Sequence, residues 1–238
     1  MLKTTVLHQV TQLTFMPLFF PVNVYLVEEE NGLTLIDCGM SFMQQGITEA
    51  AFRIGKPITT ILLTHAHPDH VGALDGLKQR FPEAELAISA RDALLLRGDT
   101  SLAPGEPDAP VKNSLKGIQA VPDRLLKDGD LIASLQAVAS PGHTPGHMAF
   151  LDRRSGVLIA GDAFQTRGGM AVSGDVRWNF PFPAWATWHK ATALHSARRL
   201  SDLRPQVLAC GHGSMVLQPY DAMQQVVARA ASRFEGHR

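Results

Sequence analysis

Short apolar runs alternate with polar turn residues along the first half of the chain, a pattern typical of strands broken by short helices. Asn31-Gly32 marks a turn, and Ser41 is placed to cap a helix. The pattern predicts strands over 4–17, 22–28, 33–36, 60–64 and 86–88, with helices over 41–53, 71–80 and 90–97. The stretch that follows, residues 98–114, is rich in Pro, Gly and Asp and reads as a long loop.

The second half repeats this plan, with strands first and longer amphipathic segments afterwards. The expected elements are strands over 123–127, 131–139, 147–152, 157–161 and 206–210, with helices over 184–202 and 219–233. Two such halves predict an α+β protein in which two sheets pack face to face with helices outside. We expect a single domain over residues 1–238, because this length suits one large core.

Composition narrows the classes of function. The chain has 238 residues, is 45% hydrophobic and carries no formal net charge, so we expect no nucleic-acid partner. No apolar run is long enough for a transmembrane helix, and the N-terminus lacks a signal-peptide pattern. The two cysteines, Cys38 and Cys210, end apolar runs and read as small buried residues. These features predict a cytoplasmic protein without membrane association.

The densest chemistry lies directly after the apolar run at 61–63, in the string Thr64-His-Ala-His-Pro-Asp-His70. It places the candidate ligands His65, His67, Asp69 and His70 in a loop at the end of a strand. Nitrogen and oxygen ligands packed this closely favour a borderline divalent metal, with zinc as the first choice.

Three later strands also end in candidate ligands. His143 follows in a turn rich in Gly and Pro, Asp162 ends the run 158–161, and His212 stands between two glycines after the run 207–210. Each position alone is more typical of a turn, but together with the first cluster they indicate one metal site at a sheet edge. Glycines beside a ligand let the backbone approach a metal closely.

In this order the motifs resemble the metallo-β-lactamase superfamily over nearly the whole chain. The resemblance implies the four-layer αββα sandwich and a dinuclear centre with two Zn²⁺, Fe or Mn being alternatives. It implies that His65, His67 and His143 hold the first metal, that Asp69, His70 and His212 hold the second, and that Asp162 bridges both. Zinc β-lactamases usually carry a cysteine where Asp162 stands, so the resemblance favours the broader hydrolase branch.

Three further residues are expected to support these ligands. Asp37, in Ile-Asp-Cys-Gly, and Thr64 are candidates for orienting the histidines. His147 lies four residues after His143, and the family pattern does not use it as a ligand, so a supporting role is favoured there too.

The resemblance also implies a reaction. A hydroxide shared by the two metals would attack a small ester, lactone or thioester, and Asp69 would pass a proton to the leaving group. Two alternatives stay open: a mononuclear iron dioxygenase acting on a persulfide, and a metal-binding module without turnover.

The substrate is expected to be a small molecule, bound by aromatic side chains. The segment after Asp162 concentrates aromatics, and an apolar acyl chain or ring would suit them. The candidates are Phe20, Phe164, Trp178, Phe180 and Phe182. The segment 164–188 could equally form a homodimer contact. Gln165 stands where the best-known lactonases have tyrosine, and the added helical domain of glyoxalase II enzymes is not expected after His212.

Overall fold

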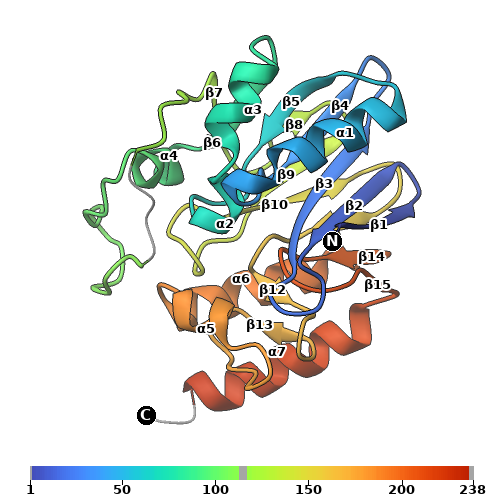
Figure 1. The fold of residues 1–238 in the computed structure, drawn as a ribbon. Helices are drawn as coiled ribbons and strands as arrows, with labels where there is room; N and C mark the ends of the chain where they lie inside the picture. The colour runs from blue at the N-terminus through green and yellow to red at the C-terminus, as the bar shows by residue number, and fades with distance from the viewer. Residues whose placement is uncertain (1, 113–116, 236–238) are drawn as a thin grey trace. The chain divides into compact units, whose positions relative to one another are not determined.

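The computed structural model describes residues 2–112 and 117–235, and two compact units make up the chain (Figure 1). Unit 1 comprises residues 1–99 and 114–126, and unit 2 comprises residues 100–113 and 127–238. Each unit has its own large β-sheet with helices. The predicted α+β class is therefore confirmed.

Unit 1 is built on a seven-stranded sheet in the order β1 to β7. Its strands are β1 (Leu2–Leu7), β2 (Val10–Phe15), β3 (Val22–Glu28), β4 (Leu33–Ile36), β5 (Ile58–Leu62), β6 (Glu85–Ser89) and β7 (Arg124–Leu126). Its helices are the 3-10 turn η1 (Ser41–Met43), α1 (Gln44–Ile54), α2 (Pro68–Val71), α3 (Leu74–Arg80) and α4 (Ala90–Leu96). The first four strands pair antiparallel, and β4 to β7 pair parallel. Parallel strands end at the same edge, so the loops after β4, β5 and β6 meet there.

Two predicted elements of unit 1 were wrong in their continuity. The expected strand 4–17 is a hairpin of β1 and β2, which turns at His8 with a φ of 54°. Histidine enters this left-handed region more readily than most residues, but it is not a turn signal as strong as Gly or Asn. The expected helix 71–80 is split into α2 and α3 at Gly72, where a side chain would overlap the backbone of Pro68 and Ser41.

Unit 2 is built on a six-stranded sheet in the order β15-β14-β11-β10-β9-β8. These strands are β8 (Leu131–Ile132), β9 (Leu135–Ala139), β10 (Met148–Asp152), β11 (Val157–Ile159), β14 (Val207–Ala209) and β15 (Val216–Leu217). A separate ribbon pairs β12 (Phe164–Gln165) with β13 (Ala171–Val172), and the helices are α5 (Phe182–Ala186), α6 (Lys190–Asp202) and α7 (Tyr220–Glu235).

Helices α6 and α7 cover one face of this sheet and close the core of unit 2. Strands β9, β10, β11 and β14 contribute apolar side chains to the same buried cluster as the two helices. Its helix members include Leu194, Leu200, Met223 and Val226. Burying each large aliphatic side chain contributes about 1.5–3 kcal/mol, so this face fixes the strands that carry the site.

Two predicted elements of unit 2 are also interrupted. The expected strand 131–139 folds back on itself at Ala133, with a φ of 49°, to give β8 and β9. The expected helix 184–202 breaks because Thr187 is extended, and α6 restarts where the His189 ring accepts a hydrogen bond from the Thr192 N–H.

The long loop predicted at 98–114 has no helix or strand over residues 98–112, and its last two residues lie outside the described part. It is nevertheless anchored within unit 2. Lys112 donates to the carbonyls of Trp185 and Thr187, and the Trp188 indole donates to the Ala109 carbonyl. Among the described residues, no helix combines the length and apolarity needed to cross a bilayer.

Candidate metal centre

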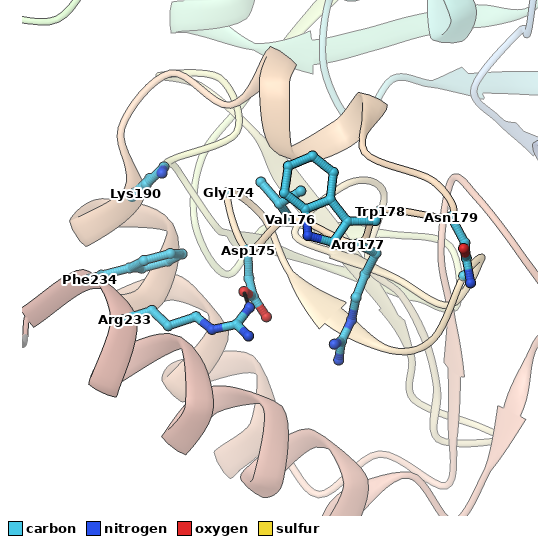
Figure 2. Close-up of a pocket in the computed structure, with 10 residues that line it drawn as sticks. Gly174, Asp175, Val176, Arg177, Trp178, Asn179, Lys190, Arg233 and Phe234 are labelled. Carbon is cyan, nitrogen blue, oxygen red and sulfur yellow. Dashed lines mark hydrogen bonds and ion pairs between the residues drawn. The ribbon is translucent and has the colours of Figure 1, made fainter.

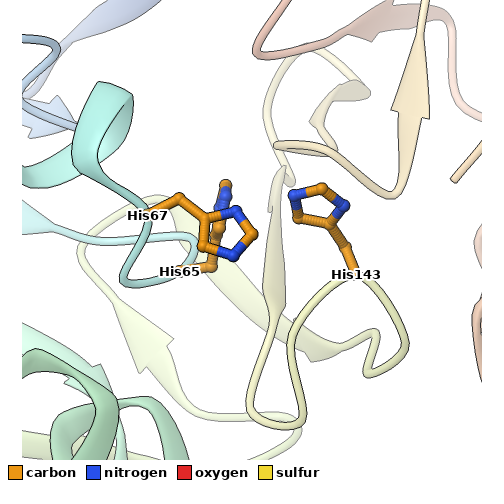
Figure 3. Close-up of side chains that lie close together, drawn as sticks. All are labelled: His65, His67 and His143. Carbon is orange, nitrogen blue, oxygen red and sulfur yellow. The ribbon is translucent and has the colours of Figure 1, made fainter. Parts of the chain in front are cut away.

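The segment from the end of β5 through α2 gathers three imidazoles in unit 1. His65 and His67 precede α2, whereas His70, like Asp69, lies within α2 and not in the loop that the sequence predicted. The ring centroids of His65 and His67 lie 4.7 Å apart, and those of His65 and His70 lie 4.0 Å apart. All three rings are buried, and the His70 Nε2 lies 3.8 Å from a carboxylate oxygen of half-buried Asp69. Figure 3 shows His65 and His67 on this loop, and His143 on a loop of unit 2.

The carboxylate of Asp37, directly after β4, holds this loop together. Its Oδ1 accepts the Thr64 N–H at 2.8 Å, while its Oδ2 lies 2.8 Å from both the Thr64 hydroxyl and the His70 Nδ1. The Thr64 hydroxyl in turn lies 2.9 Å from the His65 Nδ1. The predicted orienting positions of Asp37 and Thr64 thus have a geometric basis in unit 1.

These contacts select the tautomers of two histidines. The Thr64 hydroxyl has one hydrogen, and a carboxylate only accepts, so the hydroxyl donates to Asp37. The His65 Nδ1 must then carry the hydrogen that it donates to Thr64, and the His70 Nδ1 must donate to Asp37 in the same way. Both rings therefore present the lone pair of Nε2, the form in which imidazole binds a metal.

A residue outside the motif string also fixes the loop. Asp92 in α4 is fully buried, and its Oδ2 accepts the Ala66 N–H at 3.0 Å. Asp92 lies three residues after Ser89, whose hydroxyl accepts the Asp92 N–H and caps the helix. The sequence carries this Ser-x-x-Asp signal, but as a helix start and not as a contact to the histidine loop.

Unit 2 places two imidazoles against one carboxylate. The Asp162 Oδ2 lies 3.4 Å from the His143 Nε2 and 3.2 Å from the His212 Nε2. All three side chains are buried. The parallel strands β11 and β14 explain part of this arrangement, because Asp162 and His212 each follow the same end of neighbouring strands.

His143 is oriented by residues that sequence reasoning missed. Its Nδ1 lies 2.9 Å from the Ser173 hydroxyl, which lies 2.8 Å from the Thr187 hydroxyl. The Thr187 hydroxyl donates to the Pro183 carbonyl, so the chain of contacts ends in α5. Isolated Ser and Thr residues in a loop give no sequence signal for such a role.

His147 acts on the backbone of Asp162. Its Nε2 accepts the Asp162 N–H at 3.1 Å, so its Nδ1 carries the hydrogen that reaches the Ser140 hydroxyl at 2.8 Å. Both ring nitrogens are engaged within unit 2. The supporting role of His147 stays a prediction, and these two contacts are compatible with it.

The donor set of each unit suits a divalent metal. Buried imidazole nitrogens and carboxylate oxygens are the ligands that zinc, iron and manganese sites use. The two cysteines are fully buried, and burial raises the pKa of both thiols well above the ordinary value, with the Asp162 charge adding to the effect at Cys210. They match the small buried residues expected from the sequence.

The aromatic candidates for substrate binding have different surroundings. Phe164 is fully buried in the core cluster of unit 2, a position that gives it a packing role, and Phe20 is half-buried in unit 1. The Phe180 ring lies 5.2 Å from the His212 ring and 5.2 Å from the Phe182 ring. Phe182 is 46% exposed, so an aromatic row runs from His212 to the surface of unit 2.

Known proteins resemble this chain both in sequence and in structure. The family model described as the metallo-beta-lactamase superfamily matches residues 17–212. The solved structure of TTHA1623 in a di-iron-bound form is similar with a TM-score of 0.65 and 29% identity, covering 88% of this chain and 95% of that one. The predicted metallo-β-lactamase fold is therefore confirmed.

Two relatives in bacteria are similar over most of their length. The uncharacterized protein YobT of Bacillus subtilis (strain 168) is 54% identical over 96% of this chain and 99% of its own. The hydroxyacylglutathione hydrolase GloC of Haemophilus influenzae (strain ATCC 51907 / DSM 11121 / KW20 / Rd) is 27% identical, over 82% of this chain and 87% of its own.

Proposed function

Because the chain belongs to the metallo-β-lactamase superfamily, we propose that it is a metal-dependent hydrolase of a small ester, lactone or thioester. The observation that carries the proposal is the hydrogen bonding of the histidines. In both units the Nδ1 atoms of ligand candidates are held by hydroxyl or carboxylate groups, as at His65, His70 and His143. This is the arrangement that orients imidazoles for metal binding through Nε2.

The proposal assigns two metal ions, preferably Zn²⁺, to the seven ligand candidates. His65, His67 and His143 hold the first, Asp69, His70 and His212 hold the second, and Asp162 is shared. The pairing follows the family's ligand pattern. It is supported in unit 2 by Asp162, whose one carboxylate lies within 3.4 Å of histidines assigned to different metals.

When bound, the two metals would supply an activated water and polarise the carbonyl that is attacked. The chain's own residues would do the rest. Asp69 is half-buried, unlike the ligand histidines, and the role we assign to it is to accept a proton and return it to the leaving group. Asp37 and His147 keep the ligands in position through the contacts described above.

The aromatic row in unit 2 supports an apolar group in the substrate. Phe180 and Phe182 extend from the His212 ring, and Phe182 continues to the Trp185 ring at 5.9 Å. The relative GloC is, by its name, a hydrolase of hydroxyacylglutathione, which is a thioester. A thioester with an apolar or aromatic acyl part is therefore the first substrate to test.

The test is hydrolysis of a panel of thioesters, lactones and aryl esters, with a phosphoester as comparison. We expect turnover that is lost with a chelator and restored by added Zn²⁺, Fe²⁺ or Mn²⁺. Asp69→Ala should lower kcat by about 10²- to 10⁴-fold if it transfers the proton. Asp128→Ala, at an exposed ion pair with Arg199, is the matched control and should keep full activity.

Two results would overturn the proposal. One is a fully metal-loaded protein that cleaves no member of the panel. The other is a protein with one iron that consumes oxygen with a persulfide, which would indicate the dioxygenase instead. Full turnover in Asp69→Ala with both metals kept would contradict only the proton transfer assigned to Asp69, and the rest of the proposal would stand.

A further inference from the structure

Unit 2 contains an open pocket of about 630 Å³ that the proposed reaction does not use. Figure 2 shows its walls: Lys190 of α6 with Arg233 and Phe234 of α7 on one side, and the loop from Gly174 to Asn179 on the other. The volume lies in the range of small-molecule sites.

Positive charge exceeds negative charge in this pocket. Arg177, Lys190 and Arg233 line it, and Asp175 is its only acidic lining residue in the described part of the chain. Asp175 is 1% exposed and is already paired with Arg233 and with the Arg229 Nε at 2.9 Å. Two guanidinium groups therefore share one carboxylate.

Arg177 adds a third guanidinium to this cluster. Both Arg177 and Arg229 donate to the Met170 carbonyl, Arg229 at 3.0 Å. Burial lowers the pKa of Arg177 and the nearby Arg229 lowers it further, while the Asp175 charge raises it in part. Guanidinium groups remain charged in proteins, so the cluster carries a repulsion that a bound anion would relieve.

Two aromatic side chains complete the walls. Trp178 is 85% exposed, so its indole ring is accessible to a ligand. The Lys190 ammonium lies 5.5 Å from the Phe234 ring centroid, so this cation is held at the pocket wall by a cation–π contact. The pocket thus offers a stacking surface and several cations together.

We propose that this pocket binds an organic anion that carries a flat ring, such as an aryl phosphate or a mononucleotide. Guanidinium groups recognise phosphate and carboxylate oxygens, and an exposed indole stacks on planar rings. The ion pairs of Asp175 fix Arg233 in advance, which reduces the entropy lost on binding. The proposal does not depend on the hydrolase reaction.

The pocket loop also contacts a candidate metal ligand. The Thr166 and Arg167 N–H groups both donate to the His212 carbonyl, at 3.0 and 3.2 Å, and Gly168 directly after them lines the pocket. The anion could accordingly be the distal part of the substrate or a separate effector. The same pocket chemistry serves both.

The test is calorimetry on the metal-loaded protein with three probes: adenosine monophosphate, adenosine and inorganic phosphate. We expect the monophosphate to bind with a Kd at least about tenfold below that of either part alone, because ring and charge contribute together. Trp178→Ala should weaken its binding by about fivefold or more, in line with the usual effect of losing one stacking partner.

Lys190→Ala should also weaken the binding of adenosine monophosphate. Arg153 is an exposed arginine outside the pocket, so Arg153→Ala should leave the Kd for the monophosphate unchanged. Trp178 and Lys190 are exposed, so both variants should fold. Equal binding in Trp178→Ala, Lys190→Ala and Arg153→Ala would overturn the proposal, and it would point to phosphate binding at the metals. The proposal would also be overturned if adenosine monophosphate bound no more tightly than inorganic phosphate.

The source of the anion follows from kinetics on any substrate found. Competition by the monophosphate, seen as a higher KM, supports a site for the distal part of the substrate. A changed kcat at constant KM supports an effector site. Calorimetry reports binding even if no substrate is cleaved, so failure of the two proposals can be told apart.

Discussion

Asp37 contacts the histidine loop of unit 1 through both of its carboxylate oxygens. It accepts hydrogen bonds from the Thr64 backbone, the Thr64 hydroxyl and the His70 ring, and it has a φ of 60°. Asp and Asn enter this left-handed region more readily than most residues. The backbone of Asp37 therefore forms the turn after β4, and its carboxylate selects the tautomers of two histidines.

This role predicts the effect of Asp37→Asn. Asn suits the backbone, but its amide NH₂ must face a donor at one of the two oxygen positions. We expect metal affinity to fall by about 10- to 100-fold, as for other partners of ligand histidines. Competition with a chromophoric chelator measures this. Asp123→Asn, which replaces an exposed acceptor of the Leu86 N–H in the same unit, should leave affinity unchanged. Wild-type affinity in Asp37→Asn would contradict this account of the histidine loop.

At the scale of elements, strand ends and tight turns position the ligands. His143 lies in a turn that is joined to the start of α6, because the Gly142 carbonyl accepts the His189 N–H and the His143 carbonyl accepts the Trp188 N–H, both at 2.9 Å. Gly142 has a φ of 134°, and a Cβ there would overlap the backbone of Ala193. The turn is thus tied to the helix by close backbone contact.

Gly142→Ala should therefore destabilise the protein by more than about 2 kcal/mol, since strain and overlap with backbone add up. Gly129→Ala is the matched control. Gly129 also has a positive φ, of 85°, but a Cβ there meets nothing within 4 Å. Its cost should be about 1–2 kcal/mol from backbone strain alone. Urea unfolding compares the two, and equal losses would argue against the contact with α6.

Elements marked by strong local signals could be predicted well from the sequence. The predicted strand 33–36 matches β4, and the predicted helix 219–233 begins one residue before α7 and ends two residues before it. The hairpin turns at His8 and Ala133 were missed, because neither residue normally signals a left-handed turn. The sequence does not predict the break before α6. The extended backbone at Thr187 and the cap made by the His189 side chain create this break, and hydrophobic periodicity encodes neither.

At the scale of the whole molecule, the family and the candidate ligands could be read from motif order, because each motif ends a strand. The supporting side chains could not be read in full. Asp92 and Ser173 reach the ligand loops from distant elements, and only the fold brings them there. The pocket at Trp178 was likewise beyond the sequence, since it needs α6 and α7 to meet the loop 174–179.

The central claim is that the seven candidate residues hold two metal ions that support hydrolysis. The most direct measurement is the metal content of the purified, metal-reconstituted protein by elemental mass spectrometry, compared with Asp162→Ala. The account predicts about two ions per chain, as in other two-metal hydrolases, and about one or fewer in the variant. One ion or none in the wild-type protein, or an unchanged content in Asp162→Ala, would contradict it.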